Sequence, residues 1–312
     1  MPQSVLDDFE AETGHAVRVI YYESEEDARE LIVETRGKGM DLVVLSRQEL
    51  SAISNQSDIF SIIPYQSLAN LQYIDPIWKS KAANIFDVGV PWLWGTNGVL
   101  YRKDLVELDT VTWMDLMAPP PSLEGKVLMI PGMRDVMASA MLALGESINT
   151  ADDDALHRAG KLLEAQKHKV FDYKYMASEI VSGQVHMALS YSSDAVEFLY
   201  MDDNIVYVLP ENKTTIWLDN LAVFETSENK ELAFRFIEFV NEPERAAYIA
   251  DYLGASLVNT AATKFLSEEY LTEPSLNVPR EILESAEMHE PFSPELTSKY
   301  NAIFYNALRP VF

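Results

Sequence analysis

The stretch Asp41-Leu42-Val43-Val44-Leu45 determines the fold class that the sequence predicts. Its run of apolar residues is typical of a strand buried on both faces, as in a parallel sheet. Before it, residues 25–35 show the apolar spacing of a helix, and the β-branched and aromatic residues 17–22 predict another strand. Because strand and helix signals alternate, the sequence predicts an α/β fold.

The same alternation continues toward the C-terminus. Strands are predicted over residues 126–130, 185–191 and 220–224. Helices are predicted over residues 136–144 and 152–166, from residue 230 onward, and over residues 297–308. Thr150 is predicted to cap the helix that begins at Asp152.

The composition favours a soluble globular protein with a strong acidic excess. The 312 residues include 49 Asp and Glu against 24 Lys and Arg, a formal net charge of -25. Such a field repels nucleic acid and anionic membranes and attracts small cations, although solubility alone would also account for it. The absence of cysteine excludes disulfides and thiolate catalysis.

The motifs of the common enzyme classes do not occur in the sequence. It contains no G-x-x-x-x-G-K-[ST], no G-x-G-x-x-G, no G-x-S-x-G and no H-E-x-x-H. The five histidines are scattered and are expected to be surface or packing residues. We therefore predict no catalytic residues, no metal site and no cofactor.

Aromatic residues beside carboxylates are the main candidates for a binding site. Trp217 is two residues from Asp219, Tyr191 ends a predicted strand, and Asp135 opens a predicted helix. In α/β sheets, ligands bind beyond the carboxyl ends of strands. Aromatic faces with carboxylates at their ends would suit an elongated cation.

Several short stretches carry a resemblance to a known family. They are DLVVLS (41–46), VPWLWG (90–95), TWMDL (112–116), GQV (183–185) and IWLDNLA (216–222). In this order and spacing, the chain resembles the spermidine/putrescine-binding periplasmic proteins of ABC transporters, type II periplasmic solute-binding proteins. The resemblance implies an α/β fold of two lobes with a ligand cleft between them, and capture of a polyamine without chemistry.

The resemblance also implies a division of the chain. Residues 1–95 and 219–263 would form lobe one, and residues 96–218 and 264–312 would form lobe two. The opening strand of the family is missing from lobe one, because the chain starts at the family's first helix. Since Met1-Pro2-Gln3 does not begin a signal peptide, we expect the full-length precursor to carry one upstream, and the mature protein to be periplasmic.

The family's binding residues carry over unevenly. Trp217, Asp219 and Ser46 are identical to the family's binding residues at these positions. Asp135 occurs where the family has a Glu, and Tyr191 occurs where it has a Trp. Glu290 lies near a binding Gln of the family. Three positions depart: Gln48 replaces a Tyr, Gly132 an Asp, and Ala255 another Tyr. The expected ligand-binding residues are therefore Trp217, Asp219, Asp135, Tyr191, Ser46, Gln48 and Glu290.

These departures leave alternatives open. The chain could capture another small cationic or amino solute, or could be a polyamine-responsive sensor subunit that signals to a membrane receptor. In either case the expected partners are a small ligand and a transporter permease or membrane sensor. No nucleic-acid partner is expected, and the protein is expected to be a monomer.

Overall fold

The computed structural model describes residues 1–55, 58–130, 132–166 and 176–307 and divides the chain into two compact units. Unit 1 comprises Met1–Trp94 and Trp217–Asn277, and unit 2 comprises Gly95–Ile216 and Val278–Phe312. The last boundary falls later than the position 263 that the resemblance implied. Tyr270 is buried at 3% exposure and donates its hydroxyl to the Ala255 carbonyl at 2.6 Å, which holds this segment in unit 1.

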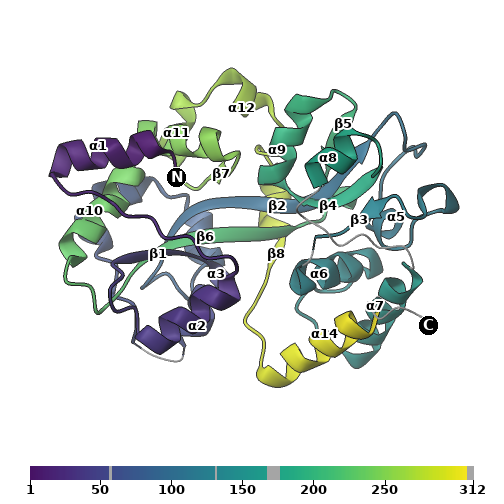
Figure 1. Ribbon diagram of the computed structural model, residues 1–312, viewed down its shortest axis with the longest axis horizontal. Helices are drawn as coiled ribbons and strands as arrows, with labels where there is room; N and C mark the ends of the chain where they lie inside the picture. Colours follow the sequence, from purple (N-terminus) through teal and green to yellow (C-terminus); the bar gives the residue numbers. More distant parts are fainter. Residues whose placement is uncertain (56–57, 131, 167–175, 308–312) are drawn as a thin grey trace. The chain divides into compact units, whose positions relative to one another are not determined.

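Unit 1 contains the helix predicted over residues 25–35 and several antiparallel strand pairings. Its elements are α1 (Gln3–Thr13), α2 (Glu25–Thr35), β1 (Leu42–Ser46), α3 (Arg47–Ser54), α4 (Pro76–Lys81), α10 (Lys230–Val240), α11 (Pro243–Leu253), β7 (Ser256–Leu257) and α12 (Glu268–Thr272). Strands β2 (Val90–Arg102) and β6 (Thr215–Val223) carry the chain from one unit to the other (Figure 1).

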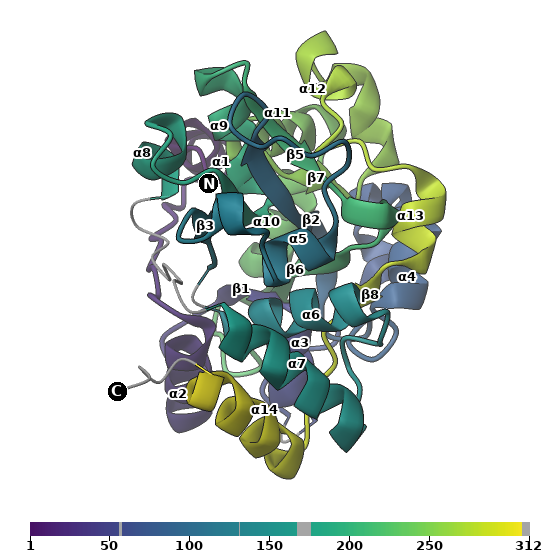
Figure 2. The ribbon, with the colours of Figure 1, turned by 90° about the vertical axis from the view of Figure 1, so that its right-hand side faces the viewer.

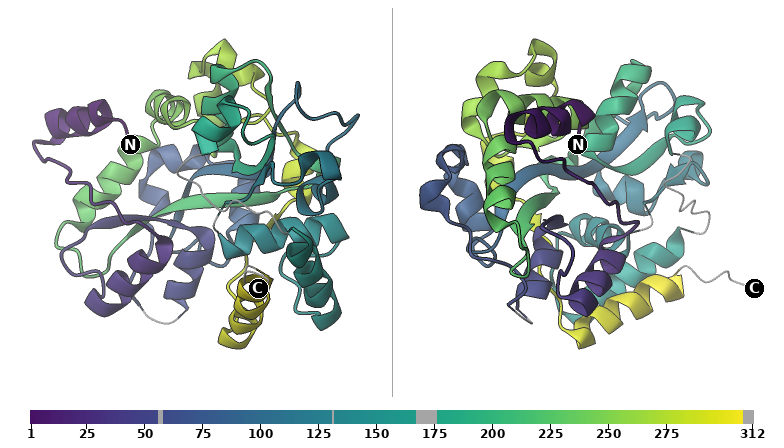
Figure 3. Two further views of the ribbon diagram at one scale, coloured as in Figure 1. Left: turned by 45° about the vertical axis from the view of Figure 1, so that its right-hand side comes forward. Right: turned by 60° about the vertical axis from the view of Figure 1, so that its left-hand side comes forward.

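Helix α1 packs on α10 through aromatic contacts. The rings of Phe9 and Phe236 meet edge to face, with centroids 5.0 Å apart. Both side chains are buried. Such T-shaped pairs stabilise a fold beyond the effect of the apolar area that they bury. Figure 3 shows the two helices lying side by side.

Two predictions for unit 1 were wrong. Residues 17–22 form no strand, and Ile20 and Tyr21 are 61% and 83% exposed. A strand needs a neighbour to pair its backbone groups, and no described strand pairs with this segment. The strand at Leu42–Ser46 exists, but it pairs antiparallel with β6 rather than in a parallel sheet.

Unit 2 is built around the second half of β2. Its elements are α5 (Trp113–Met117), β3 (Val127–Leu128), α6 (Met133–Leu144), α7 (Asp153–Ala165), α8 (Met176–Val181), β4 (Met187–Tyr191), α9 (Ser192–Met201), β5 (Ile205–Val208), α13 (Arg280–Ser285), β8 (Glu287–Met288) and α14 (Pro294–Ala307). Strand β2 pairs antiparallel with β4 and β5, and β3 runs parallel to β4.

The helices of unit 2 pack on one another as well as on the sheet. Helix α14 lies against α7 and α6 (Figure 2), and its buried Tyr300 donates to the carbonyl of Thr150 at 2.9 Å. Thr150 was predicted to cap α7, but Asp152 caps it, accepting the Ala155 N–H at 2.8 Å. The Asp152 carboxylate stands directly before the helix, so it reaches the free N–H groups of the first turn, whereas Thr150 lies two residues further away.

No helix in the described part of the chain combines the length and the apolar composition that crossing a lipid bilayer requires.

Candidate functional site

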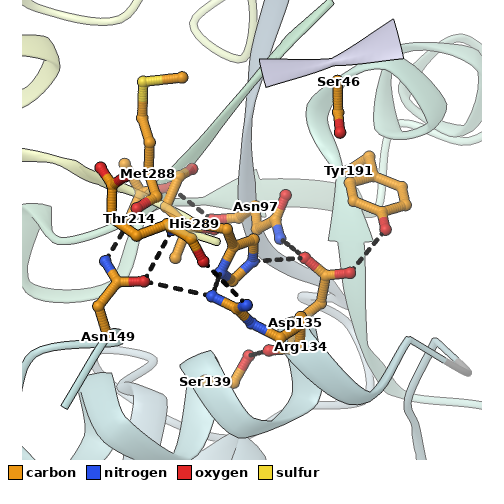
Figure 4. A network of polar contacts seen from close by, with 12 residues as sticks. Ser46, Asn97, Arg134, Asp135, Ser139, Asn149, Tyr191, Thr214, Met288 and His289 are labelled. Carbon is orange, nitrogen blue, oxygen red and sulfur yellow. Dashed lines mark hydrogen bonds and ion pairs between the residues drawn. The ribbon is translucent and has the colours of Figure 1, made fainter. Parts of the chain in front are cut away.

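Asp135 is the centre of a polar cluster in unit 2. It lies in the first turn of α6, and its side chain is 15% exposed. Asn97 donates to its Oδ1 at 2.7 Å, and the Tyr191 hydroxyl donates to its Oδ2 at 2.8 Å. His289 Nε2 lies 3.3 Å from Oδ1. Figure 4 shows these three side chains converging on the carboxylate.

The local fold explains why these residues meet. Asn97 and Tyr191 are direct partners in the β2–β4 register. Opposite residues of an antiparallel pair project to the same face of the sheet. Tyr191 is the last residue of β4, and α6 follows β3, so the cluster forms beyond strand ends. Asp135 and Tyr191, two predicted site residues, are therefore in direct contact.

The cluster keeps Asp135 ionised. Burial alone would raise the pKa of this carboxyl group, because it disfavours the charged form. The interactions with His289 and the hydrogen bonds from Tyr191 and Asn97 outweigh burial and hold the pKa below its usual value. The chain thus maintains a negative charge inside unit 2.

His289 takes a defined tautomer between Asp135 and Arg134. A guanidinium group only donates hydrogen bonds, and the Arg134 Nη2 atom lies 3.3 Å from His289 Nδ1. Nδ1 must therefore be the accepting nitrogen, which leaves the proton on Nε2 for donation to Asp135. The sequence pattern indicated no role for this histidine.

Arg134 is itself held in place by several groups. Its Nη2 donates to Asn149 Oδ1 at 3.2 Å, and Nη1 donates to the Glu290 carbonyl at 3.1 Å. Its guanidinium carbon lies 3.5 Å from the centre of the Phe292 ring. Glu290, a predicted site residue, is exposed, and its backbone carbonyl takes part in this contact. The side chain that reaches Asp135 is that of His289, the residue before it.

A second cluster of acidic groups forms around Ser46 in unit 1. The Ser46 N–H donates to Glu25 Oε1 at 2.7 Å, and its hydroxyl donates to Oε2 at 2.8 Å. The same hydroxyl accepts the Glu49 N–H at 3.3 Å and so caps α3. Ser46 is also opposite Asp219 in the β1–β6 register, so both side chains project to one face. Glu25 and Asp219 therefore flank the same serine.

Asp219 has an unusual electrostatic environment. It is half-buried, and neither a hydrogen bond nor an ion pair of its side chain is found within the described residues. Burial, together with the charge of Glu25, raises its pKa from 3.8 to about 7. A carboxyl group in this state favours a cationic partner, because a nearby positive charge would restore ionisation.

Two aromatic residues lie in the same part of unit 1. Trp217 is half-buried, and its indole Nε1 has no acceptor in the described part of the chain. The Tyr22 hydroxyl donates to the Val44 carbonyl at 2.9 Å, and burial and the charges of Glu25 and Asp219 raise its pKa. Neither Glu25 nor Tyr22 was among the predicted site residues. Two other tryptophans, Trp92 and Trp94, are buried in the core.

The three positions that were expected to differ from the family's binding residues lie in different environments. Gln48 is half-buried in the first turn of α3. Ala255 is 3% exposed. A Cβ atom at Gly132, directly before α6, would lie 2.7 Å from Asp135 Oδ2, closer than real contacts allow. Glycine at this position therefore makes room for the carboxylate at 135.

The described residues bring together no group of three or more His, Asp or Glu side chains that could hold a metal ion. What they do bring together is hydrogen-bond acceptors and carboxylates near strand ends, in a two-unit α/β fold. In α/β folds, ligands bind beyond the carboxyl ends of strands, so these groups are candidates for a binding site.

Comparison with known proteins gives the family. Residues 4–277 match the model of the bacterial extracellular solute-binding proteins, and the chain belongs to this family. It is 28% identical over 293 residues to the spermidine/putrescine-binding periplasmic protein of Escherichia coli, covering 92% of this chain and 83% of the relative. It is 26% identical over 286 residues to a norspermidine sensor of Vibrio cholerae, covering 90% and 78%.

A solved structure supports the fold. The spermidine/putrescine ABC transporter substrate-binding protein of Streptococcus pneumoniae matches with a TM-score of 0.88, covering 99% of this chain and 95% of that one, at 24% identity. The prediction of an α/β two-lobed solute-binding protein fold is therefore confirmed.

Proposed function

We propose that this protein captures a polyamine outside the cytoplasm and delivers it to an ABC-type importer. The observation that carries the proposal is Asp219, a half-buried carboxyl group without a basic partner among the described residues. Leaving such a group without a counter-charge is costly, and an ammonium group removes that cost.

The chemistry of both units supports a ligand with several ammonium groups. Unit 1 offers Asp219, Glu25 and the Trp217 ring, and unit 2 offers the ionised Asp135 beside Tyr191. Carboxylates pair with ammonium ends, and aromatic faces attract the cation and pack on its methylene groups.

The relatives support the choice of ligand and partner. Their names specify spermidine, putrescine and norspermidine, and the relatives that bind spermidine and putrescine are periplasmic. On this basis we assign capture without chemical turnover, a periplasmic location and a permease as the membrane partner. A second candidate, favoured by the norspermidine sensor relative, is a sensor subunit that signals to a membrane receptor.

Titration calorimetry with putrescine, spermidine, norspermidine and spermine tests the proposal. Replacing Asp219 by Asn keeps the shape and removes the charge, and should weaken binding by about 2–5 kcal/mol, the cost of losing a buried charge partner. Asp8→Asn is the matched control, because Asp8 is an exposed carboxylate on α1 of the same unit. Binding of a polyamine that is equally tight in wild type and in Asp219→Asn would refute the role of Asp219.

The same titration separates the proposed ligand class from its alternative. An absence of heat with all four polyamines in a protein that melts cooperatively would reject polyamine capture. Binding of a zwitterionic amino acid instead would point to an amino solute with an oxygen acceptor, for which the unpaired Trp217 indole N–H is suited.

A further inference from the structure

Asn97 carries a hydrogen-bond acceptor that has no partner. Its side chain is 3% exposed, and its Nδ2 donates to Asp135 Oδ1 at 2.7 Å. The other amide atom, Oδ1, is buried without a hydrogen-bond partner. Asn97 lies in the interior of β2, where its backbone carbonyl accepts the Thr214 hydroxyl at 2.7 Å. The backbone therefore holds the side chain at this position.

The orientation of the Asn97 amide follows from its neighbour. The pKa of Asp135 lies below its usual value, so the carboxylate is ionised at neutral pH and only accepts hydrogen bonds. The amide atom that faces it must then be the NH₂ group. Oδ1 consequently points away from the carboxylate, as Figure 4 shows, and it can only accept a hydrogen bond.

Leaving a buried amide oxygen without a partner is costly. Transferring such a group from water without a compensating hydrogen bond costs about 1–3 kcal/mol in proteins, and native structures rarely keep it unsatisfied. A donor that reaches Oδ1 when a ligand binds would remove this cost. The adjacent negative charge of Asp135 makes a positively charged N–H the favoured donor.

Asp135 is less available to a ligand than its charge indicates. A carboxylate offers about four acceptor positions, and Asn97, Tyr191 and His289 occupy three of those on Asp135. One acceptor position of the carboxylate stays open, and the Asn97 oxygen beside it is a second acceptor for an incoming donor. Asp135 fixes the amide and supplies the charge.

We infer that Asn97 is a ligand-contacting residue of unit 2, whose Oδ1 accepts an N–H of a primary or secondary ammonium group. This inference rests on the proposed function and extends it, because it makes the unit 2 contacts specific for a hydrogen-bond donor. An anion or a carbonyl oxygen would gain nothing from Asn97 Oδ1, because this atom only accepts hydrogen bonds.

Calorimetry on three variants tests the inference, with spermidine and putrescine as probes. Asn97→Leu removes the acceptor at similar volume and should weaken binding about 10- to 100-fold, the range for a hydrogen bond to a charged group. Asn97→Asp keeps an oxygen at this position and can share one proton with Asp135, so it should bind within about threefold of wild type. Asn306→Leu, an exposed position on α14, controls for the substitution itself.

The outcomes separate the roles. Equal losses in Asn97→Leu and Asn97→Asp would mean that Asn97 only orients Asp135, and wild-type affinity in Asn97→Leu would mean that it has no role in binding; either result overturns the inference. If Asn97→Leu does not melt cooperatively, Asn97→Ser replaces it with the same expected loss, because the short hydroxyl cannot reach as far. Absence of binding by wild type would instead refute the proposed function.

Discussion

Ser46 and Asp219 are direct partners across the antiparallel β1–β6 pair, and Ser46 donates hydrogen bonds to Glu25 from both its N–H and its hydroxyl. The serine thereby brings a second carboxylate beside a half-buried one. Ligand binding and proton binding should then be coupled at Asp219, because both compete for the same charge.

The affinity for polyamines should rise with pH up to about 7. Burial and Glu25 raise the pKa of Asp219 to about 7, so below this pH the carboxyl group is largely protonated in the free protein. An ammonium group favours the ionised form, so binding releases a proton, and affinity should grow by up to about tenfold per pH unit between pH 5 and 7. Titration in two buffers of different ionisation enthalpy measures this release. Proton uptake on binding would contradict the coupling.

Replacing Glu25 by Gln should move this coupling to lower pH. Gln keeps an oxygen for the Ser46 N–H and removes the charge that raises the pKa of Asp219. The midpoint of the pH dependence should fall, and binding of a dication at pH 8 should weaken modestly, by about 0.5–1.5 kcal/mol. Glu26→Gln is the control, because its carboxylate is exposed on the same helix turn. An identical shift in both variants would assign the effect to net charge alone.

The sequence pattern was informative where structure depends on neighbouring residues. The bounds of α2, residues 25–35, were predicted correctly, because Ser24 caps the helix and three acidic residues favour its first turn. That same local explanation concealed the role of Glu25, since its contact with Ser46 joins residues that are 21 positions apart. A carboxylate at a helix start gives no sign of a distant partner.

Other parts of the fold depend on pairing that a local pattern does not contain. Residues 17–22 have strand composition, but a strand needs a partner, and the described chain provides none. His289 and Asn97 reach Asp135 only because β2 and the segment after β8 pass beside α6. Neither residue belongs to a motif, so the sequence indicated only the carboxylate between them.

Removing the His289 side chain should raise the pKa of Asp135. In wild type this pKa is depressed, so the stability that ionised Asp135 contributes is present above its ordinary pKa of about 4 and is lost as pH falls through the lower folded value. In His289→Ala, acid unfolding should therefore begin at higher pH, with a loss of about 1–3 kcal/mol at neutral pH for the lost buried hydrogen bond. Urea unfolding between pH 3 and 7 measures both effects.

His289→Gln is the matched variant for this experiment. Its amide can donate to Asp135 and accept from Arg134, as the histidine tautomer does. It should retain most of the stability and shift the acid transition less than His289→Ala. If the two variants unfold alike at every pH, the contact with Asp135 contributes nothing.

Gly132→Ala should disturb the same carboxylate from the opposite side. The added Cβ would lie 2.7 Å from Asp135 Oδ2, the oxygen that accepts the Tyr191 hydroxyl. The carboxylate must then move, and we expect a destabilisation of about 1–3 kcal/mol, the usual cost of overpacking. In an Asp135→Ala background the clashing oxygen is absent, so the same glycine substitution should cost little. The double-mutant cycle, measured by urea unfolding, isolates the clash as a coupling energy. Equal costs in both backgrounds would assign the effect to the backbone at Gly132 and leave the glycine without a role in seating the carboxylate.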